Sequence, residues 1–243
     1  MRTLYGEDLA YIHHVGFGDF AASAAPGIVR LLGRNSITSG LVVDLGCGSG
    51  ILAQALLVAG YDVLGVVSQA MIRLARRQAP KAKFVAQSLR TVRLPACVAV
   101  TAIGECLNYR SDEDPKTDPN DVFRRIFLAL CAGGVFVFDI AEPALADEGN
   151  GTPTMVEGKD WMVVSEKRGD PSRNRLTRRI IAYRRIGKLY RRSEEIHHLQ
   201  LFQRTEILEG LRASGFRARA IAAYGRQHLL PSRVGFVAIK PKL

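Results

Sequence analysis

The chain has 243 residues and a formal net charge of +11, and 47% of its residues are hydrophobic. This length is enough for one large α/β domain with a sizeable core, and the composition is that of a folded protein rather than a disordered one. No apolar run approaches the roughly 18 residues of a membrane helix, and the first residues lack the apolar stretch of a signal peptide, so we expect no membrane partner.

The cysteines give no sign of a metal site or a disulfide framework. They stand at positions 47, 97, 106 and 131, far apart in the chain and without a C-x-x-C pair. We therefore expect no bound metal and no disulfide, and we expect a reducing, cytoplasmic location.

The positive charge is concentrated in one segment. Residues 159–192 hold twelve Lys or Arg and three acids, a net charge of +9. Such a patch suits nucleic acid, an anionic membrane, an acidic partner or an anionic substrate, but a solvated strand face explains it equally well.

Residues 1–40 are expected to form an N-terminal helical segment. A partly apolar helical pattern runs over residues 3–34, and two glycines that flank Phe17 predict a loop within it. Pro26 fits the start of a helix over residues 27–32.

A glycine-rich turn follows the first predicted strand. Residues 41–44 are apolar up to Asp44, glycines follow at positions 46, 48 and 50, and residues 51–59 show an apolar helical pattern. Glycine adopts positive φ at little cost and lets the backbone lie flat against a ligand. At the carboxyl edge of a parallel sheet, this pattern predicts a ligand-binding loop.

Two ligands compete for this loop. Gly48, Gly50 and Ala53 fit the looser dinucleotide fingerprint, in which a pyrophosphate rests on the helix N-terminus. Asp44, however, stands two residues before Gly46, and its carboxylate suits a cationic or hydroxyl-bearing ligand and repels a pyrophosphate. A glycine-rich turn without any ligand is the third interpretation.

The string Asp-Leu-Gly-Cys-Gly-Ser-Gly over residues 44–50 resembles the first motif of class I S-adenosylmethionine (SAM) methyltransferases. Residues 131–139 resemble a later Gly-Gly-strand step of the same family, so the resemblance covers residues 40–142. It implies an α/β fold with a Rossmann-like sheet, helices on both faces and SAM as the cofactor. The loop residues that it implies for cofactor binding are Asp44, Gly46, Cys47, Gly48 and Gly50.

The resemblance also implies site residues outside this loop. An N-terminal segment often closes over the cofactor in this family, which makes Tyr11 a candidate cofactor residue and His14 a candidate catalytic residue. Histidine titrates near neutral pH and can act as a base. The other implied cofactor residues follow the second, third and fourth predicted strands: Ser68, Gln69, Gln87, Ser88, Leu89 and Gly104.

At the end of the second strand the chain departs from the family pattern. Class I methyltransferases usually have an Asp or Glu there for the ribose hydroxyls, but residues 61–67 end in Val66 and Val67. Ser68, which we also predict to cap a helix over residues 69–78, offers only a neutral hydrogen bond.

A second family acid is absent after the third strand, which we predict over residues 83–86. Ser88 stands near the position of an Asp that contacts the adenine amine in the family, and its hydroxyl accepts a hydrogen bond less strongly than a carboxylate does. Because both acids are absent, a protein that has this fold but has lost or altered its cofactor remains an alternative interpretation.

The predicted strand over residues 97–102 leads into the candidate acceptor site. Glu105, Asn108 and Tyr109 are hydrogen-bonding residues on the loop that follows, where we expect a substrate to be oriented. We take Glu105 and Tyr109 as candidate catalytic residues. A helix over residues 121–132, ended by two glycines, and a strand over residues 135–139 then complete the SAM-binding core, residues 41–143.

Residues 144–202 predict an antiparallel β insert that caps the site. A connector over residues 144–158 precedes β-like runs at 160–167, 176–186 and 189–202, and Gly187-Lys188 predicts a tight hairpin between the last two. His197 is a candidate catalytic residue, because it shares one strand face with Arg191, Ser193 and Glu195. Residues 203–243 predict the closing helix and the last two strands of the core sheet.

These features predict an enzyme, a SAM-dependent methyltransferase that acts on a small, possibly anionic molecule by in-line displacement. The chain has no Asn/Asp-Pro-Pro-Tyr string, no Pro-Cys nucleophile and no recognisable RNA-binding module, so nucleic acid is possible as a substrate but not favoured. A macromolecule methyltransferase that uses the basic cap and a non-catalytic member of the fold remain the alternatives, and a homodimer is possible.

Overall fold

The computed structural model of the protein describes residues 5–110, 118–148 and 151–242. The helices are α1 (Glu7–Phe17), α2 (Asp19–Arg34), α3 (Ile51–Val58), α4 (Ile72–Gln78), α5 (Pro119–Ala129) and α6 (Arg204–Ala213). The strands are β1 (Leu41–Leu45), β2 (Asp62–Val67), β3 (Lys83–Ala86), β4 (Cys97–Ala102), β5 (Tyr109–Arg110), β6 (Leu130–Ala141), β7 (Thr154–Glu157), β8 (Trp161–Asp170), β9 (Arg175–Ile186), β10 (Leu189–Gln200), β11 (Arg217–Ile221), β12 (Ala223–Tyr224), β13 (Gln227–His228) and β14 (Arg233–Ile239).

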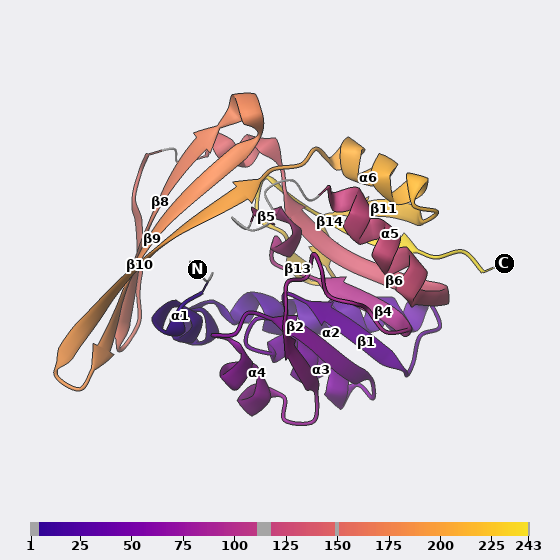
Figure 1. Cartoon of the computed structure of the whole chain (residues 1–243), viewed down its shortest axis with the longest axis horizontal. Coiled ribbons are helices and arrows are strands. Elements are labelled where there is room, and N and C mark those ends of the chain that lie inside the picture. Colours follow the sequence, from indigo (N-terminus) through magenta and orange to yellow (C-terminus); the bar gives the residue numbers. More distant parts are fainter. Residues whose placement is uncertain (1–4, 111–117, 149–150, 243) are drawn as a thin grey trace.

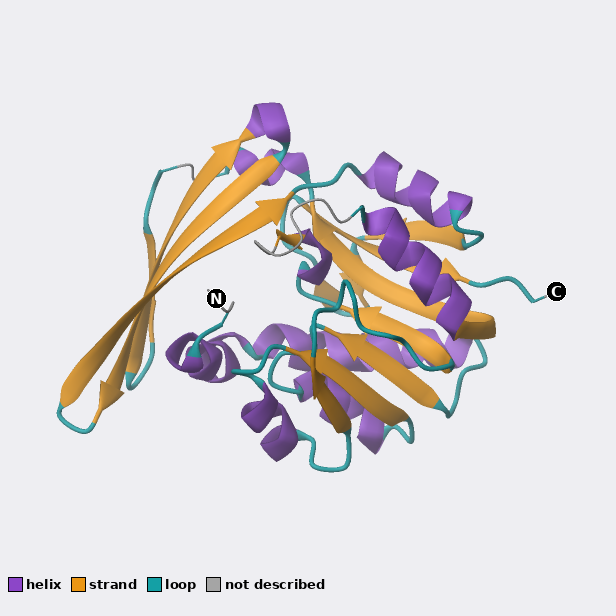
Figure 2. Cartoon of the chain, in the orientation of Figure 1, coloured by secondary structure: helices purple, strands orange, loops and turns teal. Residues whose placement is uncertain are grey.

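The core is a seven-stranded sheet in the order β11-β14-β6-β4-β1-β2-β3. Its strands are drawn in orange on the right-hand side of Figure 2. The strands from β3 to β6 pair in parallel, while β14 is antiparallel to both β6 and β11. The chain passes from β1 toward one edge through β2 and β3 and then returns to β4 on the other side of β1. Such a reversal of strand order opens a crevice at the carboxyl ends of the strands, where ligands bind in open α/β sheets.

Helices cover both faces of this sheet, as predicted (Figure 1). Successive residues of a strand point to opposite faces, and β6 shows this directly. Val137 packs into the cluster that contains residues of α2, α3 and α4, whereas Phe136 packs into the cluster that contains residues of α5 and α6. Burial on both faces explains why the central strands read as continuous apolar runs.

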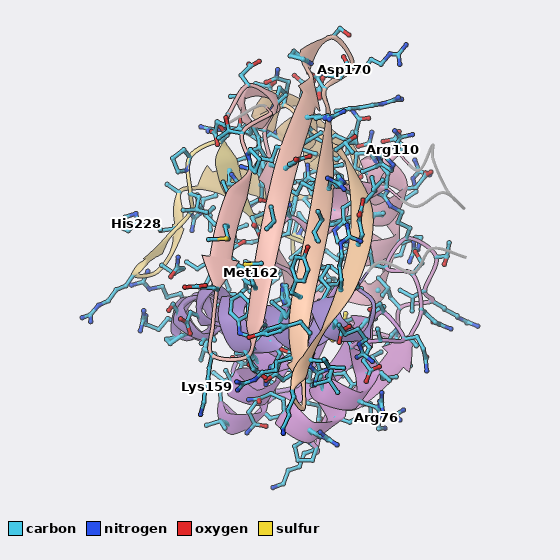
Figure 3. All side chains as sticks on the ribbon, turned by 90° about the vertical axis from the view of Figure 1, so that its left-hand side faces the viewer. Arg76, Arg110, Lys159, Met162, Asp170 and His228 are labelled. Carbon is cyan, nitrogen blue, oxygen red and sulfur yellow. The ribbon has the colours of Figure 1, made fainter. Side chains whose placement is uncertain are left out.

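The predicted insert is a five-stranded antiparallel sheet in the order β5-β10-β9-β8-β7, which we call the cap. Its long strands extend away from the core (Figure 1). Trp161 and Val163 face inward, and Met162 between them lies on the outer face (Figure 3). The cap contains two strands that the sequence analysis missed, β5 and the short edge strand β7, which lies within the expected connector.

Helix α1 packs against the cap. Leu9 and Ile12 of α1 form a buried cluster with Trp161 and other residues of β8 and β9. Asp8 lies 2.5 Å from the guanidinium of Arg191, and the same carboxylate lies 3.4 Å from Arg184.

Among the described residues no single helix is long and apolar enough to cross a membrane, and α1 and α2 meet that test only as a pair bent by 61°.

Several predicted boundaries are wrong for local reasons. Pro26 does not start a helix but lies inside α2, because the N-terminal segment breaks earlier, at Gly18. Ser68 does not cap α4, which begins at Ile72 after a turn in which the Met71 amide donates to the Ser68 carbonyl.

The two glycines at 133 and 134 do not end a helix. Helix α5 ends at Ala129, and the glycines lie within β6, which begins at Leu130. The register between β4 and β6 shifts in this region, so the glycines take part in an irregular strand start instead of a helix end.

Asn108 joins the core to the cap, and its removal is expected to be costly. The side chain is fully buried; its Nδ2 donates to the carbonyls of Ala141 and Gln200, at 3.0 and 2.7 Å, and its Oδ1 accepts from the Ala141 amide at 2.9 Å. Asn108→Ala removes three hydrogen bonds to buried backbone groups, and the Ala141 carbonyl then keeps the longer bond from the Phe202 amide, at 3.3 Å. We expect the substitution to lower the free energy of unfolding by about 3 kcal/mol.

Urea denaturation measures this loss, and Asn35→Ala is the matched control. The Asn35 side chain makes one hydrogen bond, from its Nδ2 to the Leu31 carbonyl at the end of α2, so we expect the control to lose about 1 kcal/mol or less. Equal losses in the two variants would show that Asn108 does not hold the cap to the core.

Candidate cofactor and acceptor site

The glycine loop joins β1 to α3 at the carboxyl edge of the sheet. Gly46, Gly48 and Gly50 have φ of 69°, 53° and 83°, values that side chains rarely allow. The amides of Gly46 and Cys47 donate to the Val66 carbonyl, at 2.8 and 3.1 Å, which ties the loop to β2. A Cβ at Gly48 would meet only the His13 ring, at 3.8 Å, so the backbone at Gly48 is open to a ligand.

Asp44 lies directly below this loop with one oxygen unused. Its side chain is 1% exposed; Oδ1 accepts from the Thr101 hydroxyl at 2.7 Å, and Oδ2 has no hydrogen-bond partner. Burial raises the pKa of Asp44 to about 7, although the hydrogen bond from Thr101 opposes the shift. A buried carboxylate oxygen without a partner is costly, and a cationic ligand group would satisfy it.

Ser68 offers a second buried oxygen without a partner. It follows β2, and its Oγ is enclosed by the protein with no hydrogen-bond partner. Val66 and Val67 stand where the resemblance would place an acid, and both side chains are buried. A hydroxyl group of a ligand could pair with Ser68, so the position fits a ribose with a neutral contact in place of a charged one.

The remaining predicted cofactor positions differ in their surroundings. Gln69, Gln87 and Ser88 are exposed and Leu89 is half-buried. The Ser88 Oγ accepts from the Arg90 amide at 3.2 Å, which leaves it free to make a further contact. All four lie near the carboxyl ends of β2 and β3, and a contact with the cofactor stays a prediction.

Asp139 was missed as a site residue. It lies in β6, is 1% exposed, and accepts from the amides of Gly104 and Glu105 at 2.7 and 3.2 Å and from the Tyr224 hydroxyl at 3.1 Å. Burial raises its pKa to about 7. Asp139 thus fixes the loop after β4. The sequence signal that could have identified Asp139 is an acid near the end of an apolar strand, which is also the signal at Asp44.

Glu105 lies between two arginines. Its carboxylate binds Arg178 of β9 at 2.8 Å and also Arg233 at the start of β14, and the three side chains are 10–15% exposed. Burial alone would raise the pKa of Glu105, but the two guanidinium groups outweigh it and lower the pKa. Glu105 is therefore an ionised partner of arginines and not a group that takes up a proton, and a contact with substrate stays a prediction.

Two predicted catalytic residues, Tyr109 and His197, come together with two residues of the N-terminal segment. The Tyr5 ring lies 5.1 Å from the His13 ring and 5.3 Å from the His197 ring, and the Tyr109 and His197 rings are 5.6 Å apart. The hydroxyls of Tyr5 and Tyr109 are 3.3 Å apart. We call these four residues the aromatic group. Sequence reasoning missed Tyr5, because no local pattern brings the N-terminus to the cap.

His14 and Tyr11 are held apart from the aromatic group. His14 Nδ1 lies 2.8 Å from the Ser49 Oγ, so His14 contacts the glycine loop. Tyr11 points to the cap instead: its hydroxyl donates to Asp160 at 2.8 Å, and the Arg184 guanidinium lies 3.9 Å from the centre of its ring. The hydroxyl of Tyr11 is therefore used by the cap, and a contact of Tyr11 with the cofactor stays a prediction.

Gly48→Val tests whether the loop is a binding surface. A valine adds a branched side chain where the structure is open and forces it into a positive φ, so we expect a loss of ligand affinity of on the order of 100-fold. Gly60→Val is the control, because Gly60 also has a positive φ, 94°, and open space but lies at the end of α3 away from the loop. Equal affinity for SAM in Gly48→Val and the control, measured by calorimetric titration, would contradict the assignment.

Comparisons with known proteins agree with this geometry. Residues 42–134 match the family model of the methyltransferase domain. No curated protein sequence matches the chain.

Solved structures extend the similarity to the whole chain. A SAM-dependent methyltransferase from Clostridium acetobutylicum is 18% identical with a TM-score of 0.80, over 96% of this chain and 97% of that one. A sugar N-methyltransferase from a Streptoalloteichus species is 22% identical with a TM-score of 0.78, over 98% of this chain and 95% of that one. A SAM-bound amino pentose methyltransferase from Micromonospora echinaspora is 20% identical with a TM-score of 0.75, over 99% of both chains.

At these identities the similarity establishes the fold, and it includes the cap and the N-terminal segment as well as the core. The fold predicted from the glycine loop is confirmed. Residues 42–134 of the core thus match the methyltransferase domain in sequence, and the whole chain has the fold of the SAM-dependent methyltransferases.

Proposed function

We propose that the protein is a SAM-dependent methyltransferase whose acceptor is a small-molecule amine. The observation that carries the proposal is the buried, unpartnered Oδ2 of Asp44 beneath the glycine loop. SAM carries an ammonium group, which fits this oxygen. The pyrophosphate of a dinucleotide would instead bring negative charge to an enclosed carboxylate.

The chain offers a contact for each part of the cofactor. The open backbone at Gly48 and the turns at Gly46 and Gly50 would hold the methionine part beside Asp44, and Ser68 would pair with a ribose hydroxyl. When bound, SAM supplies an electrophilic methyl group on a sulfonium. The task that remains for the protein is to bind the acceptor, orient it and exclude water.

The aromatic group supports an amine as the acceptor. Faces of Tyr5 and Tyr109 suit a cationic nitrogen, and both residues are half-buried. Two of the similar structures are described as a sugar N-methyltransferase and an amino pentose methyltransferase. We extend that acceptor chemistry, a small molecule with a nitrogen nucleophile, to this chain.

Ion pairs within the chain favour a small molecule over RNA. Much of the positive charge of the cap is paired with acids: Arg178 with Glu105, Arg179 and Arg192 with Glu194, and Arg184 and Arg191 with Asp8. Cations held in this way offer less to a phosphate backbone than a free basic patch does. The four cysteines are free, as a reducing cytoplasm would keep them.

An acceptor panel tests this function. The protein is incubated with SAM and with pairs of sugars that differ only in an amino or a hydroxyl group, and S-adenosylhomocysteine is measured. We expect it to form with amines and not with their hydroxyl counterparts or with a single-stranded RNA. Formation with the RNA or with the hydroxyl counterparts alone would contradict the proposal.

A further inference from the structure

We propose that Glu195 and His197, two residues of β10 on one face of the cap, act as a proton-accepting pair. His197 Nδ1 takes the proton that the acceptor amine must lose, and Glu195 is the positioning residue that keeps this nitrogen unprotonated. The inference rests on the proposed function and adds to it a base and the group that orients the base.

Hydrogen bonds around Glu195 determine which nitrogen of His197 carries hydrogen. Glu195 Oε1 accepts from the Gly6 amide at 2.7 Å, and Oε2 accepts from the Tyr5 amide at 2.8 Å and lies 2.8 Å from His197 Nε2. Backbone amides only donate, and an ionised carboxylate only accepts. Nε2 must therefore donate to Glu195. In a neutral imidazole the other nitrogen, Nδ1, then has a free lone pair.

This lone pair has no partner in the structure. His197 is fully buried, and its Nδ1 makes no hydrogen bond. Leaving a buried polar atom without a partner is costly, and such atoms in native proteins call for an explanation. A carboxylate that holds one imidazole nitrogen while the other stays free is the arrangement that proteins use to prepare a histidine as a base.

The groups around His197 are compatible with an imidazole that takes a proton from the acceptor amine. Arg178 is its cross-strand neighbour, and Glu105 binds that guanidinium. Titratable and charged groups that face this position from the neighbouring elements are Tyr5, Tyr109, Arg178 and Glu105, with Cys106 close to both phenols. Arg178 and Arg233 share the Glu105 carboxylate and together with it carry one net positive charge, so the Glu195 carboxylate is the group that balances a positive imidazolium.

The N-terminal segment holds Glu195 beside His197. The Tyr5 ring lies 5.3 Å from the imidazole ring, and the amides of Tyr5 and Gly6 both donate to Glu195. These two donors keep the carboxylate in place, so His197 Nε2 donates to it and the lone pair stays on Nδ1.

The step is a proton transfer. The N–H bond of the acceptor ammonium breaks, its electron pair stays on the nitrogen as the lone pair needed for methylation, and the proton forms a bond to His197 Nδ1. The resulting imidazolium keeps its Nε2–H bond to Glu195, and it returns the proton to solvent after the product leaves.

The first test needs no acceptor. In protein labelled with ¹⁵N-histidine, we expect NMR at pH 8 to show His197 with a protonated Nε2 and an unprotonated Nδ1. Glu195→Gln has only one carbonyl oxygen. With that oxygen on the Gly6 amide, the NH₂ faces His197 and the Tyr5 amide loses its acceptor, so we expect the hydrogen to move to Nδ1. A hydrogen on Nδ1 in the unmodified protein would overturn the proposal.

The second test uses the amine that gives the highest rate in the acceptor panel. At saturating SAM, we expect His197→Gln to lower kcat by on the order of 100-fold or more and to change the dependence of kcat on pH, with the Kd for SAM unchanged. His198→Gln, which alters the exposed neighbour that contacts Thr177, is the matched control and should retain activity.

The outcomes separate this inference from the proposed function. Equal kcat and equal pH profiles in His197→Gln and the unmodified protein would overturn the base while leaving methyl transfer intact. No transfer to any amine by the unmodified protein would refute the proposed function itself. Should His197→Gln fail to fold, Glu195→Gln replaces it, with an unchanged kcat and pH profile as the contradicting result.

Discussion

Asp44→Asn is expected to weaken SAM binding by on the order of 100-fold or more. The substitution keeps the shape of the side chain and its bond from Thr101, but it removes the enclosed negative charge that would pair with the cofactor ammonium. Breaking a buried charge pair by removing one partner costs about 3–5 kcal/mol, and about 2.7 kcal/mol corresponds to 100-fold in Kd. Calorimetric titration with SAM measures the loss.

The pH dependence of binding provides a second reading of the same residue. Because burial raises the pKa of Asp44 to about 7, a ligand cation must displace a proton below that pH. We expect affinity for SAM to fall by about tenfold for each pH unit below 7 and to level off above it. In Asp44→Asn this dependence should be absent.

The stability of the variant provides the control for folding. The pKa of Asp44 is raised from 3.8 to about 7, so the folded state holds this proton more tightly than the unfolded state does. The stability that this contributes is fully present below about pH 4 and is lost as the pH rises through about 7. Asp44→Asn should therefore be at least as stable as the unmodified protein at pH 8, and undiminished SAM binding by this folded variant would contradict the site.

Glu105→Ala is expected to lower the free energy of unfolding by about 3–5 kcal/mol. Arg178 and Arg233 both bind the Glu105 carboxylate, and their side chains are only 15% and 13% exposed. Without Glu105 two like charges stay together in a poorly solvated place, which is the costly case for a buried ion pair. Urea denaturation at pH 7 measures the loss.

The pH dependence and an exposed pair sharpen this prediction. The pKa of Glu105 is lowered in the folded state, so its contribution is present above the ordinary pKa of 4.5 and is lost as the pH falls through the lowered value. Asp121→Ala breaks the exposed pair with Arg124 and should cost less than about 1 kcal/mol. If Glu105→Ala costs no more than this control, the ion cluster does not stabilise the join between core and cap.

The core of the fold could be predicted because its signals are local. The run from Val42 to Gly50 contains a buried strand, an acid and the glycines of a tight turn within one short stretch, and each residue type has its own physical reason. The hairpin at Gly187-Lys188 was predicted for the same reason, and it is confirmed by the ends of β9 and β10.

Helix boundaries were predicted less well, because several residue types serve more than one purpose. Ser68 is a good cap by type, but its hydroxyl stays free and α4 starts at Ile72. Pro26 can start a helix or sit within one, and the bend at Gly18 decided between them. Burial and neighbouring elements settled these positions, and neither can be read from a short window of sequence.

The acceptor side of the site was the part that could be predicted least from the sequence. Tyr5 and Glu195 are 190 positions apart, yet the amide of one binds the carboxylate of the other. Arg233 and Glu105 meet across 128 positions. Such contacts depend on how the cap folds back onto the core, so sequence reasoning found His197 and Tyr109 as isolated candidates but not the groups that orient them.

Calorimetric titration of the purified protein with SAM, and separately with NAD, tests the central claim most directly. The account predicts one SAM site per chain with micromolar affinity, lost in Asp44→Asn, and no binding of NAD. Binding of NAD, or a folded protein that binds no SAM, would contradict it and would show that the replacement of the family acids at Val67 and Ser88 has changed what this pocket holds.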